Sequence, residues 1–186
     1  MNRKILSVIA IVAIAVCLAS VMFAMPASSK KIVEHSKTLT DIKVGEPITF
    51  DMSEVSTDYA GTVSVTIVFN RDVDKAEVYG AIYDEKPEDW PAAPGDFIVY
   101  SDRTIISPPL TTIATVEFHT FISKEVCEKE NLDPNSVIEY RMAEVAAKWL
   151  PQEAKVEGED DDKYYIRSLS VFFPHTNYAA SYWHPR

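Results

Sequence analysis

The clearest pattern in this chain is an alternation of apolar and polar residues over 61–70. Four apolar residues of this segment are spaced two positions apart: Val63, Val65, Ile67 and Phe69. Because successive side chains of a strand point to opposite faces, the spacing predicts a strand with one buried face. A second strand is expected over 75–83, and the turn residues between the two predict a hairpin.

Other short apolar segments are separated by polar or proline-containing stretches. The further strands expected are 44–50 (including its entry turn), 97–100, 104–106, 111–122 and 164–173. Pro87, Pro91 and Pro94 indicate a loop over 84–96. Ser123 is placed to cap a short helix that reaches about Asn131.

The segment 136–149 fits two kinds of structure. Four residues form one stripe of a helix: Ile138, Met142, Val145 and Trp149. Yet Ile138, Tyr140 and Met142 also alternate as in a strand, so periodicity alone leaves both alternatives open. Consistency with the strands around it favours a strand over 137–147.

The start of the chain has the pattern of an export signal. Arg3 and Lys4 precede an uncharged apolar run over 5–25, and small residues follow it. Residues 1–29 are therefore expected to be a cleaved signal peptide. A retained signal anchor is the alternative, because 21 residues in a helix rising about 1.5 Å per residue just span a bilayer core. Both alternatives predict that residues 30–186 are extracytoplasmic, either secreted or on the cell surface.

Several short strands with one short helix predict a mostly β chain built as a single antiparallel β-sandwich. Leu132-x-Pro134, followed by a strand that carries Tyr140, resembles immunoglobulin-like and fibronectin-III-like domains of exported prokaryotic surface proteins. That resemblance implies that Tyr140 closes a corner by hydrogen bonding back to the preceding turn. We expect a polar N-terminal arm (30–41), a sandwich domain (42–173) and an aromatic C-terminal tail (174–186).

Charge and cysteine content narrow the classes of partner. Without Arg3 and Lys4 the chain has 16 basic residues against 28 acidic ones, a formal charge of −12. Such a surface disfavours binding to nucleic acid or to anionic lipid headgroups, so the membrane is contacted only through an uncleaved leader. If Cys17 leaves with the leader, Cys127 has no intramolecular partner, and we expect it to be buried.

Motifs for catalysis and for transition metals are missing from the sequence. The four histidines form no zinc or copper pattern, and no nucleophile motif is present. His119 is expected to be an ordinary surface histidine. We therefore predict a protein that is not an enzyme and that uses no resident cofactor, apart from one Ca²⁺ candidate. An enzyme with a site assembled from scattered residues is an alternative.

An acidic run near the C-terminus offers oxygen ligands for Ca²⁺. Its carboxylates are Glu157, Glu159, Asp160, Asp161 and Asp162. The alternative interpretation is a solvated loop between strands, because charge runs usually face water.

Aromatic residues give the main indication of a contact surface. Four are candidates for binding a protein partner or a glycan: Trp90, Tyr178, Tyr182 and Trp183. The tail 174–186 contains no acidic residue in an otherwise acidic chain, so it either packs on its own domain or docks on a partner. Trp90 has the alternative role of anchoring its loop to the core.

The function predicted from these observations is a surface, structural or protein-interaction module. Self-assembly through the terminal segments is part of this prediction, because a sandwich can accept a strand from a neighbouring molecule. A carbohydrate-binding module that uses exposed aromatic rings is the alternative.

Overall fold

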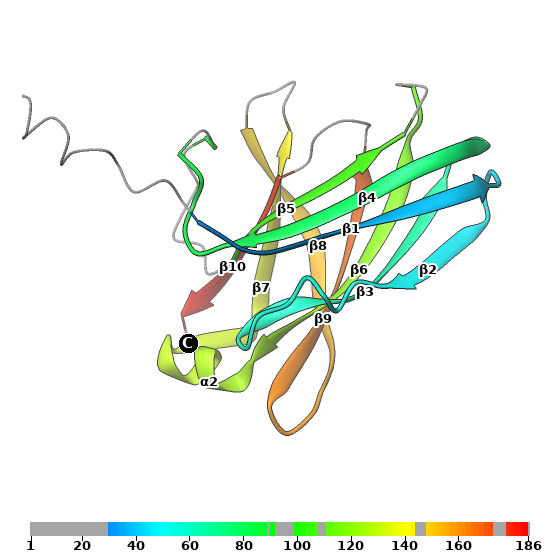
Figure 1. Cartoon of the computed structure of the whole chain (residues 1–186). Helices are drawn as coiled ribbons and strands as arrows, with labels where there is room; N and C mark the ends of the chain where they lie inside the picture. The colour runs from blue at the N-terminus through cyan, green and yellow to red at the C-terminus, as the bar shows by residue number, and fades with distance from the viewer. Residues whose placement is uncertain are drawn as a thin grey trace, which may run out of the picture.

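The computed structural model describes residues 30–88, 90–91, 99–107, 111–143, 148–172 and 178–185. These residues form ten strands and one short helix (Figure 1). The strands are β1 (Lys31–Ile42), β2 (Pro47–Asp51), β3 (Ala60–Phe69), β4 (Val73–Tyr83), β5 (Val99–Ile106), β6 (Ala114–Ser123), β7 (Leu132–Ala143), β8 (Lys148–Glu159), β9 (Lys163–Phe172) and β10 (Tyr178–Pro185), and the helix is α2 (Lys124–Lys129).

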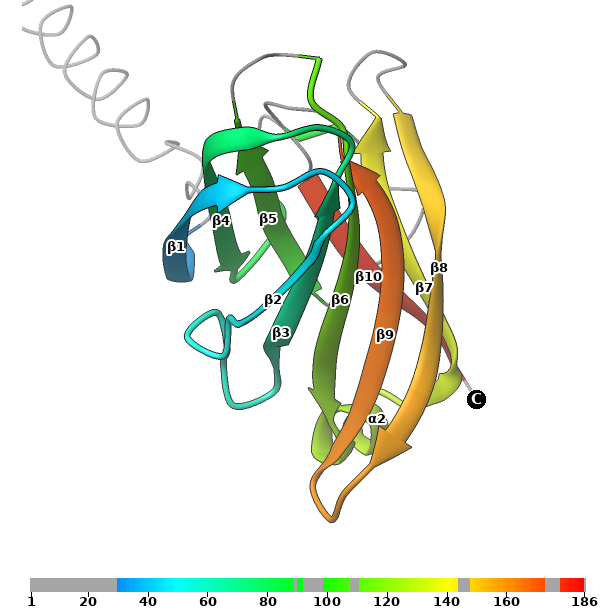
Figure 2. The ribbon, with the colours of Figure 1, turned by 90° about the vertical axis from the view of Figure 1, so that its right-hand side faces the viewer.

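The strands form two antiparallel sheets that share β8. The hydrogen-bonded order is β1-β4-β5-β10-β7-β8-β9-β6-β3-β2, and every pairing is antiparallel. The first part of β8 pairs with β7 and its second part pairs with β9, so this strand passes from one sheet into the other. Figure 2 shows β9, β6 and β3 in front of β5 and β10. The predicted mostly β, antiparallel architecture is therefore confirmed.

The core lies between the two sheets and is built from their alternating apolar positions. Val65, Ile67 and Phe69 of β3 are buried as the period-two pattern predicts. Val63 differs, with 38 % of its surface exposed, because the register of β3 against β6 shifts between Thr62 and Ser64. Such a bulge adds one residue to the strand and turns the side chain away from the core.

Ser123 caps α2 as predicted. Its side chain accepts a hydrogen bond from the Val126 N–H at 3.2 Å, and the Lys124 N–H donates to the Asp162 carbonyl at 2.7 Å. The helix ends at Lys129, two residues before the expected end, and Asn131 then adopts a positive φ of 54°. Cys127 on this helix is fully buried, as expected.

The described residues of the segment 136–149 form strands rather than a helix. Residues up to Ala143 belong to β7 and residues from Lys148 belong to β8, and Met142 pairs with Trp149 across this hairpin. The helical interpretation is wrong because the backbone hydrogen-bonding groups of β7 pair with β10 on one side and with β8 on the other. The strand alternative is confirmed for 137–143, and residues 144–147 lie outside the described part of the chain.

Both terminal segments are part of the sheets. The expected polar arm 30–41 is almost entirely β1, which pairs with β4 along its length, and Val33 packs against the core. The segment 174–186 contributes β10, so the sheets extend beyond the expected boundary at residue 173. The leader lies outside the described residues, and no helix within them has the length and apolar character needed to cross a membrane.

Candidate functional site

The C-terminal strand β10 occupies a slot in the middle of a sheet. One side pairs with β5 over Tyr178–Ser181, and the other pairs with β7 from Ala179 to Pro185. Ser181 has register partners on both sides, Val99 and Glu139. The segment singled out for its aromatic composition thus contributes an inner strand of the sheet.

An ion pair connects the two strands that border this slot. Arg103 of β5 donates from Nη1 to Oε1 of Glu139 on β7 at 2.5 Å, and both side chains are at least nine-tenths buried. The Arg103 guanidinium also lies 4.4 Å from the ring centre of Phe118, which belongs to β6 in the other sheet. A buried guanidinium needs an anion and a polarisable surface, and these two partners supply both.

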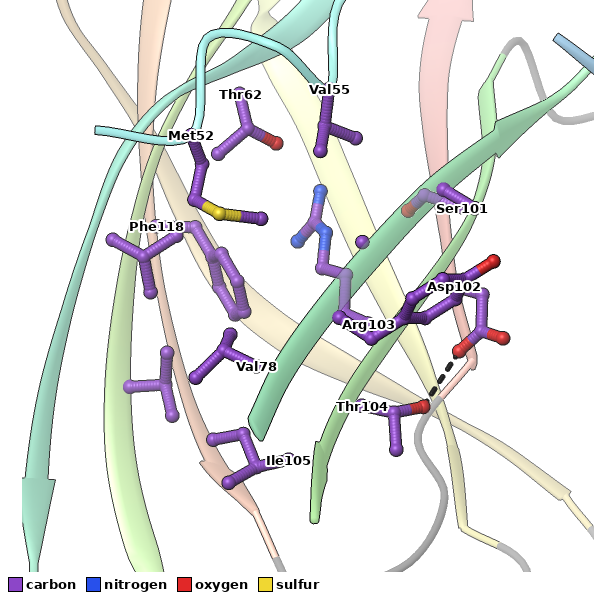
Figure 3. A pocket seen from close by; sticks show the side chains of 15 residues that line it. Met52, Val55, Thr62, Val78, Ser101, Asp102, Arg103, Thr104, Ile105 and Phe118 are labelled. Carbon is purple, nitrogen blue, oxygen red and sulfur yellow. Dashed lines mark hydrogen bonds between the residues drawn. The ribbon is translucent and has the colours of Figure 1, made fainter. Parts of the chain in front are cut away.

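Arg103 helps to line a small interior cavity. Figure 3 shows its guanidinium among side chains of both sheets, near Met52, Val55 and Thr62. The cavity has a volume of about 20 Å³, which is room for one water molecule. The cavity is therefore too small to hold an organic ligand.

His119 lies in a charged cluster on the outer face of the second sheet. Its Nδ1 is 2.6 Å from Oε1 of Glu157 on β8, and its Nε2 is 2.9 Å from Oε1 of Glu117. Arg167 of β9 donates to the other oxygen of Glu117. Glu157 reaches this cluster from a position where the register of β8 against β9 shifts, between Val156 and Gly158.

The cluster favours the protonated form of His119. Burial by itself lowers the pKa of the imidazole, but the hydrogen bonds and charges of Glu157 and Glu117 together outweigh this effect and raise the pKa above its ordinary value. Arg167 is the main cause of the lowered pKa of Glu117. With both ring nitrogens bonded to carboxylates, His119 connects β6 to β8 and has no free nitrogen to act as a general base.

Apolar side chains lie beside this cluster on the same outer face. Leu169 and Val171 of β9 are 41 % and 43 % exposed. Leu169 also borders a shallow groove of about 300 Å³, together with Glu153, Lys155, Val156, Glu157 and Arg167. Among the described residues, no helix lies over this face (Figure 2). The face therefore presents mixed charged and apolar surface to solvent.

Trp90 is buried, so the prediction of an exposed ring at this position is wrong. Only 5 % of its surface is exposed. It packs edge-on against Tyr83 and Tyr100, with ring centres 5.6 and 6.3 Å away, and lies 6.1 Å from Trp149. Lys86 Nζ donates to the Trp90 carbonyl at 2.8 Å. Trp90 therefore anchors its loop, and no ring face is available to a sugar.

The backbones of Tyr178, Tyr182 and Trp183 belong to β10, and their side chains lie outside the described part of the structure.

The acidic run forms the end of β8 and the turn into β9. Three of its five carboxylates have partners in the chain: Glu157 bonds His119, Glu159 lies 3.2 Å from Lys124 Nζ, and Asp160 accepts from the Tyr165 hydroxyl at 2.6 Å. Within the described ranges, no group of three or more acidic, histidine or cysteine side chains could hold a metal ion. Asp161 and Asp162 are exposed.

Sequence reasoning missed the Arg103–Glu139 pair and the contact of His119 with Glu157. These residues are 36 and 38 positions apart in the chain, and no local spacing marks them. Comparison of the chain with protein-family models, with curated proteins and with solved structures gave no match.

Proposed function

We propose that this chain is an exported, non-enzymatic module, folded as an immunoglobulin-like β-sandwich, that associates with copies of itself outside the cytoplasm. The N-terminal sequence, with its basic start and apolar run, supports export. Two antiparallel sheets over one core, with Tyr140 on a strand, support the sandwich.

Three side chains of types that often carry chemistry serve structural roles in the described part of the chain, which supports a binding role. His119 bonds two carboxylates, Cys127 is fully buried, and Arg103 is paired with Glu139. The outer face of the second sheet offers to solvent apolar side chains such as Leu169 and Val171, beside a shallow groove. Such a surface suits contact with another protein more than the enclosure of a small ligand.

The position of β10 is the observation that carries the proposal of self-association. A strand that lies between two others has backbone pairing on both sides, and β5 and β7 border the same slot in every copy of the chain. The strand comes from the acid-free segment 174–186, whereas the whole chain has a net charge of −10. Because this segment contains no acidic residue, it adds no carboxylate repulsion where it approaches the acidic body of a second copy.

A membrane-impermeant amine cross-linker added to intact cells that express the full chain tests this function. Exposed lysines such as Lys43 and Lys129 provide reactive groups. We expect the cross-linker to produce covalent multimers of the chain without cell lysis. Reaction only after lysis would contradict the extracytoplasmic location, and labelled monomers alone would contradict self-association.

A further inference from the structure

We propose that the copies associate by exchanging β10, so that the C-terminal strand of one molecule fills the slot between β5 and β7 of a second copy. This inference rests on the proposed self-association and specifies the element that forms the contact. Exchange of a terminal element requires no contact that the closed molecule does not already make.

Removal of β10 leaves both walls of the slot attached to the body of the protein. Strand β5 keeps seven register pairs with β4, and β7 keeps five with β8. Within the described part of the chain β10 pairs with β5 and β7 alone, so its departure breaks no other strand pairing.

The Arg103–Glu139 pair holds the two walls at the spacing that a strand requires. It connects β5 to β7 directly, and neither residue belongs to β10. Phe118 fixes the guanidinium from the opposite sheet. The body of the molecule therefore contains interactions that keep the slot wide enough for a strand, either its own β10 or the β10 of a second copy.

The outer edges of the sheets are less suited to adding a strand. Strand β2 has five residues and begins with Pro47, which cannot donate a backbone hydrogen bond. On the other edge, Lys37 of β1 turns its ammonium group toward β2, 5.2 Å from the ring centre of Phe50. An inward-directed charge and a proline are features that protect sheet edges, so the slot is the better site for pairing between copies.

A pair of cysteines across the slot tests the exchange in the full chain. Val99 and Ser181 are direct register partners, and direct antiparallel partners lie within the distance that a disulfide spans. The variant V99C/S181C is oxidised and analysed on a denaturing gel without reductant. T49C/T66C is the matched control, because these partners on β2 and β3 lie outside the slot and their hydroxyl oxygens are 2.8 Å apart.

We expect V99C/S181C to form covalent dimers and longer species whose fraction rises with protein concentration. T49C/T66C should form internally linked monomers at every concentration, and single-cysteine variants control for Cys17 and Cys127. A mixture of V99C with S181C chains, unfolded and refolded together, should give cross-linked heterodimers.

Two outcomes overturn the exchange. One is a V99C/S181C sample that light scattering shows to be assembled but that contains only internal disulfides; self-association then stands while exchange of β10 fails. The other is the absence of any disulfide in both V99C/S181C and Y140C/A180C, the second pair using the partners on β7. A sample that is monomeric throughout contradicts the proposed function itself.

Discussion

Arg103 and Glu139 make a buried contact, and its contribution to the stability of the fold depends on both partners being present. Each side chain is less than a tenth exposed, so removal of either leaves a charge in a site that water hardly reaches. Removal of both side chains leaves an apolar interior in which neither charge of the pair remains. The pair is therefore expected to be strongly non-additive under mutation.

The first prediction concerns this pair. Arg103→Met and Glu139→Leu should each lower the free energy of unfolding by about 3 kcal/mol or more. The double variant should lose much less than the sum, because no uncompensated charge remains. Urea unfolding followed by tryptophan fluorescence measures all three. Additive losses would contradict the description of the pair as an isolated buried contact.

The second prediction concerns His119, whose raised pKa makes stability depend on pH. A group whose pKa is higher in the folded than in the unfolded protein stabilises fully below its unfolded value, about 6.5 for histidine, and this contribution is lost as pH rises through the folded value. His119→Gln should therefore cost about 0.5 to 1 kcal/mol at pH 6 and clearly less at pH 9.

Unfolding curves at the two pH values measure this difference. Glu157→Gln removes one of the two carboxylates and should abolish part of the pH dependence while His119 remains. Equal losses for His119→Gln at both pH values would show that the two carboxylates do not raise the pKa of the imidazole.

At the scale of elements, Gly61 is the position where the loop after β2 meets the start of β3. A Cβ added there would lie 2.1 Å from Ser56 Oγ and 2.7 Å from the Ser56 Cα. Because the backbone of this loop would have to shift, the packing of Met52 and Val55 on the core depends on this glycine.

The third prediction follows from that contact. Gly61→Ala should lower the free energy of unfolding by about 1 to 3 kcal/mol, the usual cost of overpacking. Gly158→Ala is the matched control, because its Cβ would meet nothing within 4 Å and the change should stay within about 0.5 kcal/mol. Thermal unfolding of the two variants makes the comparison, and equal effects would contradict it.

The sequence predicted elements whose pattern is local and left open those that depend on distant partners. The alternation in β3 and the cap at Ser123 depend on neighbours in the chain, and both appear in the structure. The segment around Tyr140 was ambiguous because pairing with β10 and β8 determines it. Arg103 and Glu139 lie on strands separated by β10, so no spacing in the sequence could bring them together.

At the scale of the whole molecule, charge and topology act together. The chain has 28 acidic residues, and like charge on identical molecules opposes their association. An acid-free terminal strand that pairs on both sides offers a route around this repulsion. At physiological ionic strength the Debye screening length is about 8 Å, so repulsion between charges farther apart than this is largely removed. Added salt should therefore favour assembly.

The fourth prediction is therefore that the assembled fraction of the full chain increases when salt is raised from low to physiological concentration. An exchanged strand makes between two copies the same apolar and backbone contacts that it makes within one, and salt does not weaken these contacts. Added salt does weaken the repulsion between the acidic bodies of the two copies. Sedimentation velocity at a series of salt concentrations measures the fraction. A decrease would indicate contacts dominated by attraction between opposite charges instead.

Self-association is the central claim, and light scattering coupled to size-exclusion chromatography tests it most directly. The measurement gives the molar mass of the purified, exported chain over a wide range of concentration. We predict masses at multiples of the single chain that grow with concentration. A mass of one chain at every concentration would contradict the proposed function.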